Sequence, residues 1–332
     1  MFFRRSSRGR PDATPQPAGL PEPLAIDAIS PFLRSHLGLP HLNWDEALDH
    51  IDSTTQTDSD ADELAHAMIA GWVDFLAQTL QSKYRTPLER WRSIGVEGLA
   101  PKADRMRLER AAASSLATIG RALTPILGDP NEHPIAHITI IAAPTMDAYY
   151  DLVDAYRQDD GHVASSGGIY LGDSSINPST LILNVDRHAF EHSIAHELTH
   201  HALAPRSEDA GDLPLWAEEG LTQMMEERVT NQCFFTIDHE KMRRHRALWS
   251  SIGLAGFLHG DTFRSPEDGH QELSYNLAEA VTRSLLDTRP AEFFAFARAC
   301  LHGQSASAAA MEHLCQSEEA IMLRFLGLDT HK

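Results

Sequence analysis

Apolar residues recur at helical spacing in two long stretches of the N-terminal half of the chain, residues 62–84 and 101–127. In the first stretch, Leu64, Met68 and Trp72 follow one another at intervals of four residues, which places them on one face of a helix. The second stretch repeats this spacing. Both stretches therefore predict helices whose apolar faces pack against another part of the protein.

The pattern changes in the middle of the chain, where short apolar runs replace the helical spacing. Residues 137–142 form an apolar run rich in isoleucine, which predicts a strand, and residues 145–157 predict an amphipathic helix. Two further apolar runs, 163–171 and 180–185, flank a turn rich in Gly, Asp, Asn and Pro. They predict a β-hairpin that leads into a helix over residues 186–203.

This helix contains the sequence HELTH, from His196 to His200. Histidines four residues apart on a helix share one face, so His196 and His200 can bind the same metal ion. Glu197 faces the cleft beside them and can act as a general base. His188 and His192 continue the spacing backwards but bracket no glutamate, so we expect them, like His201, outside the metal site.

Glu219 supplies the third protein ligand that a catalytic zinc ion requires. It belongs to the sequence WAEEGL, residues 216–221, and eighteen residues separate it from His200. Together with HELTH, this segment resembles the gluzincin metallopeptidases, the clan of thermolysin and the aminopeptidase N relatives. The resemblance covers about residues 135–290 in the order of the elements. It implies a Zn²⁺ ion bound by His196, His200 and Glu219.

The resemblance also implies residues that assist the metal. In related enzymes a Tyr or His from the C-terminal helical part donates a hydrogen bond to the developing oxyanion, and Tyr275 is our candidate, with His270 or His245 as alternatives. Thermolysin-like enzymes carry an Asp one turn after the glutamate ligand, where this chain has Gln223. The amide oxygen of Gln223 can orient an imidazole but supplies no charge.

In gluzincins, the strand before the zinc helix lies at the edge of the sheet and pairs with the substrate backbone. Gly167 and Gly168 would permit close approach of such a substrate, although a bulge in an ordinary hairpin explains them equally well. Aminopeptidase relatives hold the substrate amino terminus with an acid in this segment. Residues 165–170 contain no carboxylate, which favours an endopeptidase, and Glu218 remains an alternative group for binding an amine.

The patterns together predict an α+β fold, in which a small mixed sheet with an edge strand packed on the zinc-binding helix is flanked by helical N-terminal and C-terminal parts. Helical spacing in the C-terminal part covers residues 240–257, 273–286, 291–302 and 306–326. The expected regions are a disordered, Pro-rich lead at 1–30, a helical region at 31–130, the catalytic α/β region at 131–230, and a helical region at 231–332 that completes the cleft.

Charge and cysteine content restrict the partners and the compartment. The chain has 28 Lys and Arg against 47 Asp and Glu, a net charge of −19, and such a surface repels nucleic acid and anionic lipid. The three cysteines have no short paired spacing, and no apolar run follows the basic first residues. We therefore expect a cytoplasmic protein, with an organelle transit peptide as the alternative for the Arg- and Ser-rich start.

These residues predict zinc-dependent hydrolysis of peptide bonds in a peptide or protein substrate, by a metal-activated water with Glu197 as the general base. Two alternatives stay open. The zinc site could brace the helices of a non-catalytic interaction protein, or the same chemistry could hydrolyse a non-peptide amide or ester.

Overall fold

The computed structural model describes residues 21–93, 95–129, 135, 137–157, 167–172, 180–184, 190–205, 210–233 and 235–329. Its helices are α1 (Ile26–Ile29), α2 (Trp44–Thr54), α3 (Asp58–Tyr84), α4 (Arg105–Leu127), α5 (Met146–Arg157), α6 (Phe190–Leu203), α7 (Leu215–Thr230), α8 (His239–Ile252), α9 (Ala255–Leu258), α10 (His270–Thr288), α11 (Pro290–Leu301), α12 (Ala306–Ala309) and α13 (Glu318–Leu326). Its strands are β1 (Leu33–His36), β2 (Leu39–Leu42), β3 (Leu88–Ser93), β4 (Val96–Pro101), β5 (Ile138–Ala143), β6 (Gly168–Leu171) and β7 (Thr180–Asn184).

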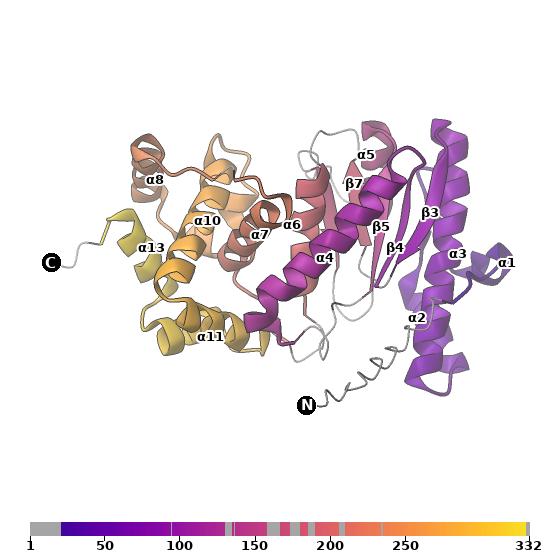
Figure 1. Ribbon diagram of the computed structural model, residues 1–332, viewed down its shortest axis with the longest axis horizontal. Coiled ribbons are helices and arrows are strands. Elements are labelled where there is room, and N and C mark those ends of the chain that lie inside the picture. Colours follow the sequence, from indigo (N-terminus) through magenta and orange to yellow (C-terminus); the bar gives the residue numbers. More distant parts are fainter. Residues whose placement is uncertain are drawn as a thin grey trace, which may run out of the picture.

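Five of the described strands form one mixed sheet in the order β3-β4-β5-β7-β6 (Figure 1). The inner strands β4, β5 and β7 are parallel, whereas β3 and β6 run antiparallel to their neighbours at the two edges. Strands β1 and β2 pair separately. The chain therefore has the predicted α+β fold, with helical parts before and after the sheet.

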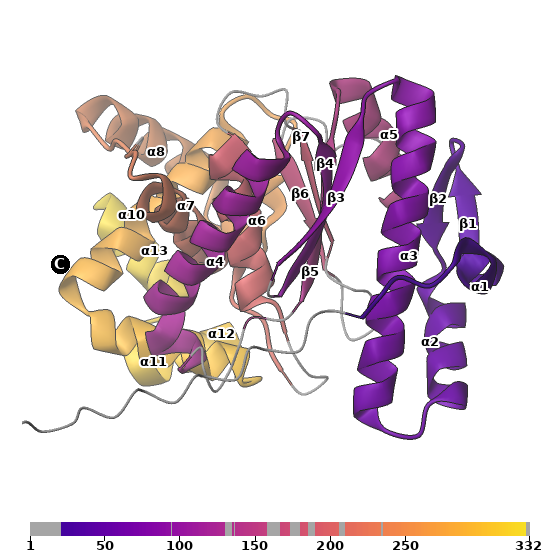
Figure 2. The same cartoon turned by 45° about the vertical axis from the view of Figure 1, so that its right-hand side comes forward.

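Helices cover both faces of this sheet. Helices α3 and α5 pack on one face and α4 and α6 on the other, as the views in Figure 1 and Figure 2 show. Because both faces are covered, every residue of β4 and β5 is buried. The C-terminal helices lie beyond α6, so the helix that carries the HELTH sequence is packed between the sheet and the C-terminal helices (Figure 1).

Strands β3 and β4 lie in the region 31–130, which is therefore not helical throughout. Strand β4 has the sequence VEGLAP, and Glu, Gly and Pro are depleted in strands, so propensity indicates no strand there. Its glycine has a packing role, because a Cβ atom at Gly98 would lie 2.1 Å from the ring of Trp91 on the paired strand. Tertiary packing thus overrides local preference at this edge of the sheet.

The disordered lead predicted over residues 1–30 is wrong for its last part. Residues 1–20 lie outside the described residues, but residues 21–30 pack against α3. The backbone N–H of Leu24 donates a 3.0 Å hydrogen bond to α3, and Ile29 is fully buried. A Cβ atom at Gly71 would lie 2.5 Å from Leu24 O, so this glycine permits the close contact. The segment is ordered by α3, not by its own composition.

The C-terminal helices follow the predicted spacing with two breaks. The helix expected over 240–257 ends at Ile252, because Gly253 has a φ of 75°. The helix expected over 306–326 is divided at Cys315, which has a φ of 57°. Among the described helices, none has both the length and the apolar sequence that crossing a bilayer requires.

Candidate metal centre

Helix α6 presents its two motif histidines on the side away from its main core contacts. Phe190, Ile194 and Leu198 are each at most 1% exposed and belong to the core shared with α4 and the sheet. The side chains of His196 and His200 remain 19% and 15% exposed. The helix therefore buries one face and opens the other to the neighbouring helix α7, as its apolar spacing predicts.

Helix α7 brings Glu219 to the same place. The following residue, Gly220, lies against α10, where a Cβ atom would be 2.2 Å from Thr282 Oγ1 and 2.6 Å from Ala278 O. The hydroxyl of Thr222 donates to Glu219 O at 2.8 Å and lies 3.3 Å from Glu219 Oε2. A glycine at this position lets α7 pack closely on α10, and the threonine restrains the Glu219 carboxylate.

Three potential ligand atoms converge between α6 and α7. The Nε2 atoms of His196 and His200 are 3.1 Å apart, and Glu219 Oε2 lies 3.4 Å from the first and 3.7 Å from the second. A tetrahedral zinc ion with bonds of about 2.0–2.1 Å spaces its ligands about 3.3 Å apart. The three atoms therefore fit such an ion, and no other cluster of this kind occurs among the described His, Cys, Asp and Glu residues.

Each of these histidines is hydrogen-bonded to a carboxylate through its other nitrogen. Glu226 Oε1 lies 2.6 Å from His196 Nδ1, and Glu218 Oε1 lies 2.6 Å from His200 Nδ1. A carboxylate that accepts the Nδ1 proton leaves the Nε2 lone pair free for a metal ion and makes the imidazole a stronger ligand. The two glutamates thus orient both rings toward the convergence point.

Gln223, the predicted orienting residue, makes neither of these contacts. It lines a cavity beside the site, while Glu226 and Glu218 occupy the two Nδ1 atoms. Sequence reasoning missed the orienting role of both glutamates. The available signal was their placement on α7, since Glu218 precedes Glu219 directly and Glu226 follows it by two helical turns, on the same face.

Electrostatics favour positive charge at the convergence point. Burial disfavours the charged form of His196, but its hydrogen bonds to Glu219 and Glu226 outweigh burial and raise the pKa of this imidazole well above its ordinary value. Burial also acts to lower the pKa of His200, but the hydrogen bond to Glu218 and the charge of Glu219 outweigh it, and the pKa of His200 is raised. Burial acts to raise the pKa of Glu219, yet the two histidines lower it. A cation between these groups would take the place of the protons.

The edge of the sheet fixes Glu197. Its Oε2 atom accepts a 2.8 Å hydrogen bond from the backbone N–H of Tyr170 on β6, and the residue is 8% exposed. Asn184 N donates to Gly167 O, so Gly167 faces β7 with its backbone groups. In an antiparallel pair this direction alternates from residue to residue, and the backbone groups of Tyr170, three residues later, therefore point away from β7. Glu197 therefore occupies a backbone donor of the edge strand, and its charge acts on His196 of the same helix.

Gly168 lies next to the side chain of Glu197 that accepts this hydrogen bond. A Cβ atom there would be 2.7 Å from Leu183 Cδ2 and 3.4 Å from Glu197 Cγ. The missing side chain thus makes room for Leu183 and for the stem of Glu197. Gly167 and Gly168 both lie at the edge strand, as expected, and for Gly168 the structure provides a packing reason that needs no substrate.

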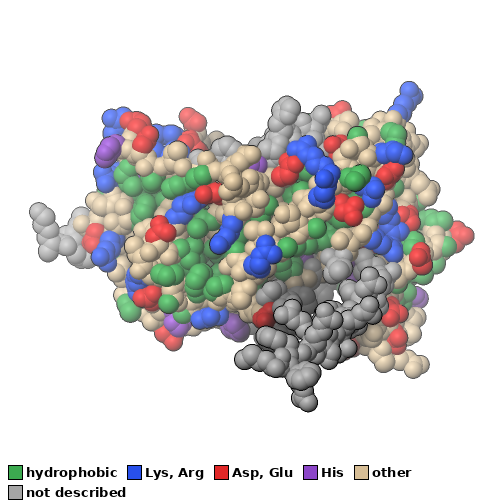
Figure 3. Space-filling view, viewed as in Figure 1, with side chains coloured by type: hydrophobic (Ala, Val, Ile, Leu, Met, Phe, Trp, Pro, Cys, Tyr) green, Lys and Arg blue, Asp and Glu red, His purple; other side chains and the backbone are tan. Residues whose placement is uncertain are grey.

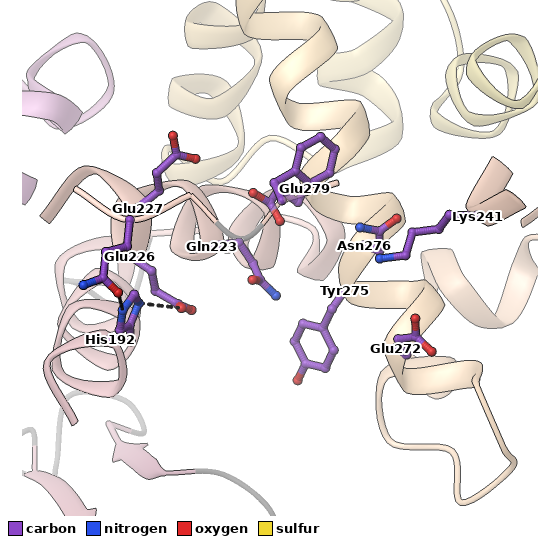
Figure 4. Close-up of a pocket in the computed structure, with 11 residues that line it drawn as sticks. His192, Gln223, Glu226, Glu227, Lys241, Glu272, Tyr275, Asn276 and Glu279 are labelled. Carbon is purple, nitrogen blue, oxygen red and sulfur yellow. Dashed lines mark hydrogen bonds and ion pairs between the residues drawn. The ribbon is translucent and has the colours of Figure 1, made fainter. Parts of the chain in front are cut away.

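Tyr275 on α10 lies beside the same site and projects into the neighbouring cavity (Figure 4). Burial, followed by the charges of Glu219 and Glu197, raises the pKa of Tyr275 well above its usual range, so the phenol keeps its proton. Its ring packs edge-on against Phe263, with the centroids 5.2 Å apart. Tyr275 is therefore a neutral hydrogen-bond donor held by aromatic packing.

The alternative histidines are bonded elsewhere. Both ring nitrogens of His245 contact side chains of α8 and α10, at 3.2 and 2.9 Å, and those of His270 lie 3.2 Å from Ser265 Oγ and Glu267 Oε2. On α6, His192 Nε2 lies 3.2 Å from Gln232 Oε1, and His201 is buried. His188 lies outside the described residues. These histidines are not part of the three-atom convergence.

No known family model matches the sequence, and a search of curated proteins finds no similar one. The function must therefore be argued from the arrangement of the residues themselves.

Proposed function

We propose that the protein is a zinc-dependent endopeptidase. The observation that carries this proposal is the convergence of His196 Nε2, His200 Nε2 and Glu219 Oε2 within 4.8 Å of one another, with Glu197 on the same helix. A structural zinc site has four protein ligands, whereas a catalytic site has three and leaves one position for water. Two imidazoles and one carboxylate, with a further glutamate on the same helix that is not part of the cluster, match the catalytic kind.

His196, His200 and Glu219 would hold the metal ion. When bound, zinc supplies a Lewis acid that polarises a carbonyl group and lowers the pKa of a water to about 7. Glu197 accepts a proton from the attacking water, whose oxygen adds to the carbonyl carbon of the peptide bond. The C–N bond then breaks, and Glu197 returns the proton to the leaving amine. The hydrogen bond from Tyr170 N keeps this carboxylate in position.

Tyr275 is the proposed donor to the oxyanion that forms on the carbonyl oxygen. Its high pKa keeps the phenol protonated throughout the neutral range, and among the described residues no hydrogen bond occupies its hydroxyl group. A donor that is already in place stabilises developing charge without reorganisation. Gln223 lines the same cavity and is a weaker candidate for contact with the substrate.

Two features support a peptide substrate cleaved within the chain. The edge strand β6 pairs with β7 on one side only within the described sheet, so the outward backbone groups that Glu197 does not occupy can pair with an extended peptide. Glu218, the group that could have bound an amino terminus, is instead bonded to His200. Both features favour an endopeptidase over an aminopeptidase or a hydrolase of other amides and esters.

The proposed place of action is the cytoplasm, with a peptide or protein as partner and without nucleic acid or membrane. Cys233, Cys300 and Cys315 are all free thiols, which accords with a reducing compartment. On the face shown in Figure 3, Lys and Arg side chains of the described residues are interspersed with Asp and Glu, so this face has no continuous basic surface for a phosphate backbone.

The decisive experiment compares the intact protein with Glu197→Gln. Metal content and cleavage of a diverse peptide library would be measured before and after treatment with a chelator and zinc. We expect one zinc per chain in both proteins, and chelator-reversible cleavage only in the intact protein. Stoichiometric zinc without cleavage of any peptide would favour the zinc-braced interaction protein. A fully active Glu197→Gln protein would refute the proposed general base.

A further inference from the structure

A cavity of about 320 Å³ adjoins the metal centre between α7 and α10 (Figure 4). This volume is at the lower end of the range for pockets that bind small ligands or side chains. Three of its lining residues belong to the site already described: Glu226, which is bonded to His196, Tyr275, and Gln223 one turn beyond Glu219. A group that fills the cavity would therefore lie next to the reacting atoms.

The inner wall of the cavity contains a buried carboxylate with a free oxygen. Glu279 is only 7% exposed and lines the cavity. Its Oε1 atom accepts hydrogen bonds from Arg283 Nε at 2.9 Å and Arg283 Nη2 at 2.6 Å. Its Oε2 atom makes no hydrogen bond among the described residues and retains accessible surface, so this oxygen is open to the cavity that the residue lines. A largely buried carboxylate with one accessible oxygen can accept a charge-assisted hydrogen bond from a ligand.

Arg283 does not balance the negative charge of the carboxylates at this end of the cavity. The same guanidinium is also paired with Glu227, so one cation serves two carboxylates. Burial, outweighing the attraction of Arg283, raises the pKa of Glu279, and the charges of Glu226 and Glu227 act in the same direction. The inner end of the cavity thus has three carboxylates, Glu226, Glu227 and Glu279, near the single guanidinium of Arg283, next to the candidate metal centre.

The other end of the cavity is electrically balanced. There Glu272 forms a bidentate pair with Arg244, with N–O distances of 3.1 and 2.7 Å, and the charge of Lys241 also acts on Glu272. Figure 4 shows Lys241 and Glu272 on the side of Tyr275 away from Glu226. The cavity is thus polarised, with its acidic end toward the candidate metal centre and Lys241, the one Lys or Arg among its described lining residues, at the far end.

We propose that this cavity is a specificity pocket for a Lys or Arg side chain of the substrate, whose cationic head donates to Glu279 Oε2. The inference rests on the proposed peptidase function, since it names the residue that sits beside the bond to be cleaved. The aromatic ring of Tyr275 packs on the methylene stem of the basic side chain, and the amide of Gln223 is available to its remaining donors. A neutral side chain offers no opposite charge to the Glu279 carboxylate.

The binding step can be tested without any cleavage. Isothermal titration of the zinc-loaded protein would compare Nα-acetyl-arginine amide with Nα-acetyl-citrulline amide, which has the same shape without the charge. Because a hydrogen bond between charged groups is worth roughly a tenfold or greater difference in affinity, we expect at least tenfold tighter binding of the arginine compound. Blocking the α-amine excludes binding through an amino terminus.

Glu279→Gln should reduce this ratio to near one, whereas Glu312→Gln, an exposed glutamate outside the cavity, should leave it unchanged. Gln223→Glu adds a carboxylate to the same wall and should raise the ratio several-fold. This second variant decides the matter if Glu279→Gln does not fold, as judged by circular dichroism. Equal affinity for both compounds in the intact protein, or a ratio that neither variant changes, would overturn the assignment.

Measuring peptide cleavage distinguishes failure of the specificity pocket from failure of the proposed peptidase function. Doubly blocked peptides that differ only in Lys or Arg against norleucine or citrulline should differ at least tenfold in kcat/KM. Cleavage of all these peptides at equal rates would refute the specificity pocket while leaving the peptidase intact. Selective binding of the arginine compound without cleavage of any peptide would refute the peptidase and leave a cation-binding cavity. Preference for a free amino terminus over a basic side chain would also count against the pocket.

Discussion

The carboxylate of Glu226 lies 2.6 Å from His196 Nδ1, although the two residues are on different helices and 30 positions apart. The same glutamate also faces His192, with its Oε2 atom 3.8 Å from His192 Nδ1. Helix α7 therefore contributes to the candidate metal centre at two points, a potential ligand at Glu219 and an orienting group two turns later. The metal site depends on the full crossing of α6 and α7.

Replacing Glu226 by Ala should weaken zinc binding by about 10–100-fold, because His196 loses the acceptor that fixes its ring and its tautomer. Competition with a chromophoric chelator would measure the affinity. Glu227→Ala is the matched control, since this neighbouring glutamate is paired with Arg283 and does not contact either ligand histidine. Equal zinc affinity of the Glu226 variant and the intact protein would contradict the orienting role.

If Tyr275 is the proposed donor to the oxyanion, replacing it by Phe should lower kcat roughly 100-fold and leave the zinc content unchanged, because only the hydroxyl group is removed. The aromatic contact with Phe263 remains in this variant. Steady-state kinetics on a cleaved library peptide would provide the comparison. His270→Gln serves as the control, as His270 is bonded to Ser265 and Glu267. A larger loss in the His270 variant would move the donor role to that residue.

Replacing Gly220 by Ala should lower the free energy of unfolding by about 1–3 kcal/mol, because the added methyl group overlaps Thr282 and the Ala278 carbonyl. The strain would separate α7 from α10 and displace Glu219, so zinc affinity should fall as well. Urea denaturation and metal titration of the same preparation would measure both effects. Unchanged stability would show that α10 can move away at little cost.

His137 makes stability depend on pH. Burial, followed by the neighbouring His66 and His201, lowers the pKa of His137 to about 4. Its pKa in the fold is thus below the unfolded value of 6.5, so between these values only the unfolded chain binds the proton. Stability is retained above pH 6.5 and falls as the pH decreases to 4, by at most about 3 kcal/mol.

Urea denaturation at pH 7, 5.5 and 4 would measure this loss. In His137→Phe the part of the loss that comes from this residue should disappear, and the curve should be flatter. The Nε2 atom of His137 is buried without a hydrogen bond, so a phenylalanine removes no bond at that position. Identical pH dependence of both proteins would show that His137 takes up its proton in the folded state.

The sequence was sufficient for the parts of the site that depend on one helix. The four-residue spacing of His196 and His200 has only one geometric outcome on α6, and the buried stripe of Phe190, Ile194 and Leu198 follows from the same period. The position of Glu219 required the resemblance as well, because nothing local determines where a second helix crosses the first. The structure brings all three ligand atoms together.

The partners of the two Nδ1 atoms could not be derived in this way. They depend on the crossing of α6 and α7, which places Glu218 and Glu226 behind the rings and leaves Gln223 at the cavity. A shift of a few ångströms between the helices would select other side chains. Residue spacing within α7 contains no information about that shift.

Strand β4 was missed for a related reason. Its glutamate, glycine and proline oppose strand formation locally, and only pairing with β3 and β5 explains the strand. Residues 21–30 illustrate the same effect in the lead segment, where contact with α3 provides order that composition does not. Both errors arise where long-range packing decides the local structure.

The hydrogen bond from Tyr170 N to Glu197 has a further consequence for the free protein. Exposed edge strands recruit strands from other chains, and a carboxylate on such an edge opposes this intermolecular pairing. By occupying the N–H of Tyr170, Glu197 removes one of the outward donors through which a second chain could pair with β6. A chain that pairs with β6 while this hydrogen bond is intact therefore has to do so through the other outward backbone groups of the strand.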